Sequence, residues 1–253
     1  MGIGDDCAIL NIPAGCQLSV SVDNMLEGRH FPKDIDPAAL AWRALAAAAS
    51  DLAAAGASPL GFTLSLALPD VSEAWLSDFS AGLFKAASAF NMPLVGGDTT
   101  KGPLNIGVQV LGTVQAGRAL LRSGAKVDDD IWLSGALGGA HGALAFLPEA
   151  QPDNLPKLSG SEMPEAFFQA YYYPMPCLRL GQQLIGVANS AVDISDGLLA
   201  DLTHILVASS CGASLDLQAI PLCSSLVDYF ESSVALDCAL NGGDDYQLCF
   251  TAG

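Results

Sequence analysis

The sequence predicts two consecutive α/β domains, one spanning residues 1–117 and the other residues 118–253. Segments with the periodicity of strands alternate with helix-like segments in both halves of the chain. After Val114 this alternation is interrupted by the polar connection RALLRSGAKVDDD, which indicates a boundary near residues 115–120. Hydrophobic residues make up 51% of the chain and charged residues 15%, so we expect a well-buried core and not a disordered chain.

The first half contains predicted strands at Cys7–Ile12, Gln17–Asp23, FTLSLALP, LVGGDTT and LNIGVQVLGTV. A helix begins with Asp36 as its N-cap and Pro37 at its first position, and it ends before Gly56. Along this helix the large apolar residues form one stripe, whereas Asp51 is the only polar group on a face of small residues. Ser72 caps a second helix, which runs to about Asn91.

The second half begins with the strand DIWLSG and a glycine-rich turn, GALGGAHG, before a short helical stretch. Residues 150–165 are rich in proline and polar residues, which predicts a long surface loop. The remaining predicted elements are a helix near 176–188, a strand ending at SAVDISDG, a helix near 198–210, the strand ASLDL, two short helices, and a last strand in QLCFT.

The charge balance disfavours one class of partner. The net charge is −17, from 27 acidic and 10 basic residues, so no basic surface is available to bind nucleic acid. Divalent cations would still allow an acidic protein to bind phosphates. The seven cysteines form no CxxC pair, which predicts free thiols in the reducing cytoplasm. We expect no signal peptide and no membrane-spanning segment, and both ends of the chain look truncated.

Acidic residues recur beside glycines or at predicted strand ends in both halves. They are found in GIGDD, SVD, VGGDTT, VDISDG and NGGDDY. One such turn is ordinarily structural, and Asp196 is equally consistent with a helix cap. The recurrence instead favours a phosphate site with several Mg²⁺ ions, because clustered carboxylates without a cation would repel one another.

The usual nucleotide-binding and hydrolase signatures are absent. The chain has no GxxxxGK[ST], no GxGxxG after a strand, no protein-kinase set, no HExxH and no GxSxG. The glycine-rich GALGGAHG is equally consistent with a simple turn.

Seven strings, in chain order, resemble the thiamine-monophosphate kinase family: GIGDD, SVDNMLEGRHF, ALAAAASDLAAAGASP, LVGGDTTKGPLNI, LRSGAK, AVDISDGLLADLTHI and GGDDYQLCFT. This family lies in the superfamily of aminoimidazole ribonucleotide synthetase and selenophosphate synthetase. The resemblance implies a two-domain PurM-like fold, in which an N-terminal α/β domain dimerises through its sheets and a C-terminal α/β domain follows. It also implies that ATP phosphorylates thiamine monophosphate to thiamine diphosphate, with several Mg²⁺ ions.

The resemblance implies three sets of site residues. The Mg²⁺ ligands would be Asp6, Ser21, Asp23, Asp51, Asp98, Asp193 and Asp196. The positions that contact ATP would be Gly97, Asp98, Arg122 and Ser195. The substrate would contact His30 and Asp244. No catalytic base is expected, because the acceptor is a phosphate whose second pKa is near ~6.

The chain also departs from the family pattern. Val22 stands where a threonine is usual, Asp244 where a glutamate is usual, and the family's final segment, with an aromatic residue for the thiamine pocket, is absent. Two alternatives therefore stay open. One is a superfamily relative such as selenophosphate synthetase, which would need a reactive cysteine near the start; Cys7 is expected to be buried. The other is a nucleotide- or metal-binding protein without catalysis.

Overall fold

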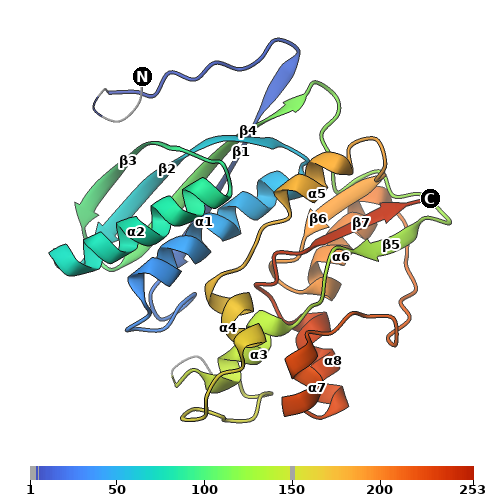
Figure 1. Ribbon diagram of the computed structural model, residues 1–253. Coiled ribbons are helices and arrows are strands. Elements are labelled where there is room, and N and C mark those ends of the chain that lie inside the picture. The colour runs from blue at the N-terminus through green and yellow to red at the C-terminus, as the bar shows by residue number, and fades with distance from the viewer. Residues whose placement is uncertain (1–3, 5, 149–151) are drawn as a thin grey trace.

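The computed structural model describes residues 4, 6–148 and 152–253, and its strands form two sheets (Figure 1). The first sheet has the order β1-β4-β2-β3. Strands β1 and β4 are antiparallel, as are β4 and β2, whereas β2 and β3 are parallel. The bounds of its strands are β1 (Cys16–Leu26), β2 (Ser58–Leu68), β3 (Leu94–Lys101) and β4 (Asn105–Gln115).

Helices α1 (Pro37–Ala54) and α2 (Glu73–Ala89) lie on the same side of this sheet (Figure 1). Both begin where the sequence predicts. Asp36 accepts a hydrogen bond from the amide of Ala39 at 3.0 Å, and Ser72 accepts one from Trp75 at 3.3 Å. The first helix ends at Ala54, and Gly56 follows its C-cap Ala55 with a φ of +68°, which suits glycine. The two predicted caps are confirmed.

Helix α1 is buried on all sides, and not along one stripe alone. Every residue from Ala39 to Ser50 is buried. Small residues make this packing feasible, because a Cβ on Gly82 of α2 would lie 2.2 Å from the carbonyl oxygen of Ala38. A Cβ on Gly181 would likewise lie 2.0 Å from the carbonyl oxygen of Ala53. Helices α2 and α5 (Leu178–Gln183) therefore approach α1 closely at Ala38 and Ala53.

The second sheet has the order β5-β7-β6, and both of its pairings are antiparallel. Its strands are β5 (Asp130–Leu133), β6 (Ser190–Asp193) and β7 (Leu248–Ala252). The helices of this half are α3 (Gly139–Ala143), the 3₁₀ turn η1 (Leu144–Phe146), α4 (Glu165–Tyr172), α5 (Leu178–Gln183), α6 (Leu198–Ser209), α7 (Ser224–Tyr229) and α8 (Ser232–Asn241).

The two halves share one hydrophobic core. The cluster formed by α1, α2 and the first sheet also contains Leu178, Ala191, Tyr246 and Leu248 from the second half. Two smaller clusters lie wholly beyond residue 118. The predicted boundary between residues 117 and 118 stays a prediction.

Several predicted elements are wrong. Residues 7–12 and 213–217 form no strand, because they pair with none of the described strands. Helix α4 was not predicted, and α5 is shorter than residues 176–188. Cys7 is exposed, not buried in a strand. In the described chain no helix is both long and apolar enough to cross a membrane.

Candidate active site

Three carboxylates from different elements lie near one another: Asp23 of β1, Asp51 of α1 and Asp193 of β6. Burial raises the pKa of Asp23 to about 6, and the negative charge of Asp51 contributes. Burial raises the pKa of Asp193 to about 7, again with a contribution from Asp51. The hydroxyl of Ser21 donates a hydrogen bond to Oδ2 of Asp51. The fold therefore brings together four of the seven residues that the family resemblance implied as metal ligands.

These four residues fit a hard divalent cation in their chemistry. Carboxylate and hydroxyl oxygens suit Mg²⁺, which commonly takes one or two carboxylates and fills its remaining positions with water and phosphates. Among the described residues, no group of three acidic, histidine or cysteine side chains is placed so that it could hold a metal ion by itself. A partial set of this kind is what a metal shared with a phosphate substrate needs. The raised pKa values agree, because a cation would offset the cost of burying negative charge.

The other predicted metal ligands have exposed side chains. They are Asp6, Asp98 and Asp196. Asp98 lies within β3, opposite Ser65 of β2. The strand β3 therefore continues through the two glycines of LVGGDTT. Asp196 lies in the turn after β6. That these three bind metal stays a prediction.

The predicted ATP-contacting residues come from both halves of the chain: Gly97 and Asp98 lie in β3, whereas Arg122 and Ser195 lie in loops. A Cβ on Gly97 would lie 2.1 Å from the carbonyl oxygen of Leu64, so the packing of β3 on β2 already requires glycine there. Arg122 is exposed, and its carbonyl oxygen accepts a hydrogen bond from the hydroxyl of Ser209 at 3.3 Å. The side chain of Ser195 is exposed in the turn after β6. Their contacts with ATP stay predictions.

The turn after β6 is folded around Asp201. Its Oδ2 accepts hydrogen bonds from the amides of Ser195, Asp196 and Gly197 at 3.0, 3.0 and 3.1 Å. Gly197 occupies the N-cap position of α6, with no side-chain cap. The alternative that Asp196 caps this helix is therefore wrong, and its carboxylate stays exposed.

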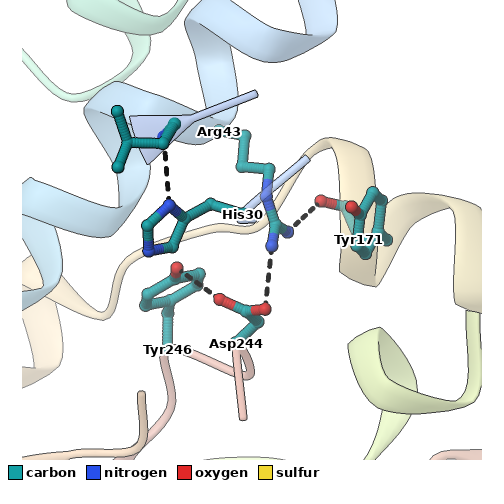
Figure 2. Close-up of polar contacts among 6 residues, drawn as sticks. His30, Arg43, Tyr171, Asp244 and Tyr246 are labelled. Carbon is teal, nitrogen blue, oxygen red and sulfur yellow. Dashed lines mark hydrogen bonds and ion pairs between the residues drawn. The ribbon is translucent and has the colours of Figure 1, made fainter. Parts of the chain in front are cut away.

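A second polar cluster joins the two predicted substrate residues (Figure 2). Nη2 of Arg43 pairs with Oδ2 of Asp244 at 2.9 Å, and the hydroxyl of Tyr246 donates to Oδ1 of Asp244 at 2.8 Å. Nδ1 of His30 accepts a hydrogen bond from the amide of Leu26 at 3.0 Å. Figure 2 shows the ring of His30 pointing toward Tyr246 and Asp244. The two predicted residues thus face a common region.

Tyr246 connects this cluster to the carboxylates. Burial and then the charge of Asp244 raise the pKa of Tyr246 well above its ordinary value, so its hydroxyl keeps its proton. Asp23 contributes to the same rise, which places Tyr246 near the acids as well. Tyr246 therefore lies near both Asp244 and Asp23.

The glycine-rich GALGGAHG turn is folded around Asp245. The amide of Gly138 donates to Oδ2 of this residue at 2.7 Å, and the amides of Gly139 and Ala140 also bond to it. Burial nevertheless raises the pKa of Asp245 to about 7. These amides hold a carboxylate of the chain itself, so the turn is structural.

A cavity in the second half of the chain lies away from this polar region. It measures about 870 Å³ and is bounded by β5, α6 and residues 210–221. None of the predicted site residues lines it. A second cavity of about 430 Å³ lies beside residues 32–36 and the aromatic end of α4.

Sequence reasoning missed three residues of the site: Arg43, Tyr246 and Asp201. Two of them carried a recognisable signal. Arg43 is a lone cation in an alanine-rich helix that was expected to be buried, and Asp201 is an acid in the first turn of a helix. Nothing local distinguishes Tyr246, because its partners lie in other elements.

The comparisons with known proteins agree with each other. Residues 4–114 match the model of the family AIR synthase related protein, N-terminal domain. Over 251 residues the chain is 47% identical to thiamine-monophosphate kinase of Escherichia coli K12, covering 99% of this chain and 76% of that protein.

Two solved structures are similar throughout the chain. Thiamine-monophosphate kinase of Stenotrophomonas maltophilia K279a has a TM-score of 0.92 at 42% identity, covering 100% of this chain and 80% of that one. A structure described as AaThiL complexed with AMPPCP and TMP has a TM-score of 0.85 at 29% identity, covering 99% and 79%.

Proposed function

The chain belongs to the thiamine-monophosphate kinase family, and from this premise we infer that it transfers the γ-phosphoryl group of ATP to thiamine monophosphate. The products are ADP and thiamine diphosphate. A relative of similar fold is described as complexed with AMPPCP, an ATP analogue, and TMP, which supports both substrates. Within the site, the observation that carries the proposal is the convergence of Asp23, Asp51 and Asp193 from both halves of the chain.

Mg²⁺ is proposed to be held by Ser21, Asp23, Asp51 and Asp193, with Asp6, Asp98 and Asp196 as further ligands. When bound, Mg²⁺ neutralises the negative charge of two phosphate-bearing substrates in an acidic site. Asp193 is buried and Asp23 is partly buried, which raises the pKa of both carboxyl groups in the absence of a cation. Gly97, Asp98, Arg122 and Ser195 are proposed to contact ATP. Arg122 would add a positive charge beside the phosphates.

The chain's contribution at the acceptor is to position it. The terminal phosphate of thiamine monophosphate has a second pKa near ~6, so it is largely dianionic at neutral pH and needs no general base. His30 and Asp244 are proposed to hold the acceptor, because Tyr246 bonds Asp244 and faces the ring of His30 (Figure 2), and the charge of Asp23 contributes to the raised pKa of Tyr246. In-line placement of the two phosphates then accounts for the transfer.

A homodimer and a cytoplasmic location complete the proposal. Leu18, Val20 and Val22 of β1 are exposed on the sheet face opposite Ser21 and Asp23, which supports pairing of two copies through this sheet. All seven cysteines are free thiols, which supports a reducing compartment.

The test is product formation by the purified chain with MgATP, with and without thiamine monophosphate. We expect ADP and thiamine diphosphate only when both substrates and Mg²⁺ are present. Asp51→Asn should lower the turnover by about a hundredfold or more with an unchanged circular dichroism spectrum. Asp228→Asn, which removes an exposed carboxylate outside the site, is the matched control. ADP formation that ignores thiamine monophosphate would contradict the proposed acceptor.

A further inference from the structure

We propose that Arg43 is a positioning residue for the acceptor: it holds Asp244 in the place from which that carboxylate contacts thiamine monophosphate. The inference rests on the proposed function, in which Asp244 binds the substrate. Arg43 itself would touch no substrate, because its side chain is 1% exposed.

The guanidinium of Arg43 is held from several directions (Figure 2). Nη2 pairs with Oδ2 of Asp244 at 2.9 Å, and Nη1 donates to the carbonyl oxygen of Tyr171 at 2.5 Å. Its central carbon lies 4.1 Å from the centroid of the Tyr171 ring. Nη1 is therefore held by the end of α4 and Nη2 by Asp244, which leaves the guanidinium little freedom.

The partner of this buried cation faces outward. The side chain of Asp244 is 41% exposed, whereas Arg43 is buried among apolar residues of α1. Burying a guanidinium is costly, and within the described residues its Nε has no hydrogen-bond partner. An apolar side chain would fill this position without the cost of burying a charge. The positive charge of Arg43 is therefore better explained by its pairing with the carboxylate of Asp244.

The turn that carries Asp244 needs such an anchor. Asp244 and Tyr246 have φ values of 68° and 51°, in the left-handed region that residues other than glycine rarely adopt. Two backbone hydrogen bonds hold the turn, from the amide of Asp244 to the carbonyl of Ser195 and from the amide of Tyr246 to that of Ile194, both at 2.8 Å. These bonds fix the backbone, but the direction of the carboxylate depends on Arg43 and the Tyr246 hydroxyl.

Arg43 also ties the acceptor residue to the metal-binding acids. Arg43 and Asp51 lie on the same helix, eight positions apart, which is about 12 Å along its axis. A helix buried on all sides moves as a rigid body. Through Arg43, α1 therefore sets the distance between the proposed metal ligand Asp51 and the proposed acceptor contact Asp244.

The experiment compares Arg43→Met, Arg43→Lys and the control Arg179→Met, which removes an exposed arginine from α5. In Arg43→Met we expect the KM for thiamine monophosphate to rise about tenfold or more and the KM for ATP to stay within about twofold. Arg43→Lys should fall between wild type and Arg43→Met, because lysine keeps the charge but cannot bond Asp244 and Tyr171 in the same fork. Melting curves check that each variant is folded. If Arg43→Met is not folded, the KM of Arg43→Lys for thiamine monophosphate tests the inference.

A second comparison asks whether Arg43 acts through Asp244. In an Asp244→Asn background, adding Arg43→Met should change the KM for thiamine monophosphate by less than about twofold, because the carboxylate to be positioned is gone. The inference would be overturned if the effects of Arg43→Met and Asp244→Asn on the KM for thiamine monophosphate multiplied as independent effects do. It would also be overturned by a folded Arg43 variant with an unchanged KM for thiamine monophosphate, or by one in which the KM values for both substrates change equally. Loss of turnover in wild type and Arg179→Met as well would instead reject the proposed function, and the inference with it.

Discussion

At the scale of single residues, burial controls the carboxyl groups of this chain. Asp23, Asp193 and Asp245 have pKa values of about 6, 7 and 7, and burial is the largest cause in each case. Asp245 differs from the other two because it is not a proposed metal ligand; the amides of Gly138, Gly139 and Ala140 bond to it. Its titration therefore reports on folding alone.

Asp245 should make the stability of the chain fall as the pH rises. Its folded pKa of about 7 lies above the ordinary value of 3.8, so between these values the folded state binds one more proton than the unfolded state. The stabilisation is present at low pH and is lost as the pH rises through about 7. Relative to Asp245→Asn, the wild-type free energy of unfolding should fall by about 2 to 4 kcal/mol between pH 4 and pH 7.

Urea unfolding of both proteins at several pH values measures this difference. Asp228→Asn serves as the control, since an exposed carboxylate should leave the wild-type pH profile unchanged. Parallel profiles for wild type and Asp245→Asn would show that Asp245 is already ionised in the folded chain.

At the scale of elements, α1 organises the site. Its alanine-rich sequence lets α2, α5 and the first sheet approach closely, and it carries both Arg43 and Asp51. The sequence predicted its start, its end and its small face, because caps and side-chain sizes are local properties.

Residues 213–217 show the opposite case. They alternate like a strand, but a strand needs a partner, and Ala213, Ser214 and Leu215 instead line the 870 Å³ cavity.

Gly82→Ala should test the contact between α1 and α2. Helix propensity alone would make alanine about 1 kcal/mol better than glycine at this position. The added Cβ would lie 2.2 Å from the carbonyl oxygen of Ala38, so we expect a net destabilisation of about 1 to 3 kcal/mol. Ala81→Gly, at the exposed neighbouring position, should cost about 1 kcal/mol by propensity alone. Urea unfolding measures whether Gly82→Ala lowers or raises the free energy of unfolding. A stabilised Gly82→Ala would refute the close packing.

At the scale of the whole molecule, two sheets share one core, and one sheet face is left uncovered. The site lies where the halves meet, because Asp51 belongs to the first half and Asp193 and Asp244 to the second. On the far face of the first sheet, Leu18, Val20 and Val22 are 46%, 51% and 57% exposed. An apolar strip of this kind on an edge strand favours association.

Val20→Asp should therefore separate the proposed dimer. Two carboxylates would be buried at the paired sheets without a counter-charge, which costs several kcal/mol. Sedimentation velocity should show a dimer for wild type and a monomer for Val20→Asp. Val207→Asp, on the exposed face of α6, should remain a dimer. A wild-type monomer at micromolar concentration would contradict the proposed association.

The sequence alone determines the local features of this protein, which are the caps of α1 and α2 and the positions of most strands. It also shows the recurring acidic residues, in strings that resemble one family. The resemblance to that family also groups Asp23, Asp51 and Asp193 in one functional set. These properties depend on residue type and on neighbours within a few positions, which a sequence displays directly.

Only the tertiary structure decides which side chains face one another. Arg43 meets Asp244 across 201 positions of the chain, and the amides of GALGGAHG meet Asp245 and no ligand. Burial then shifts the pKa values that the sequence would leave ordinary. The physical reason is that such contacts, and the loss of water around them, exist only once distant elements pack together, and no local pattern encodes that packing.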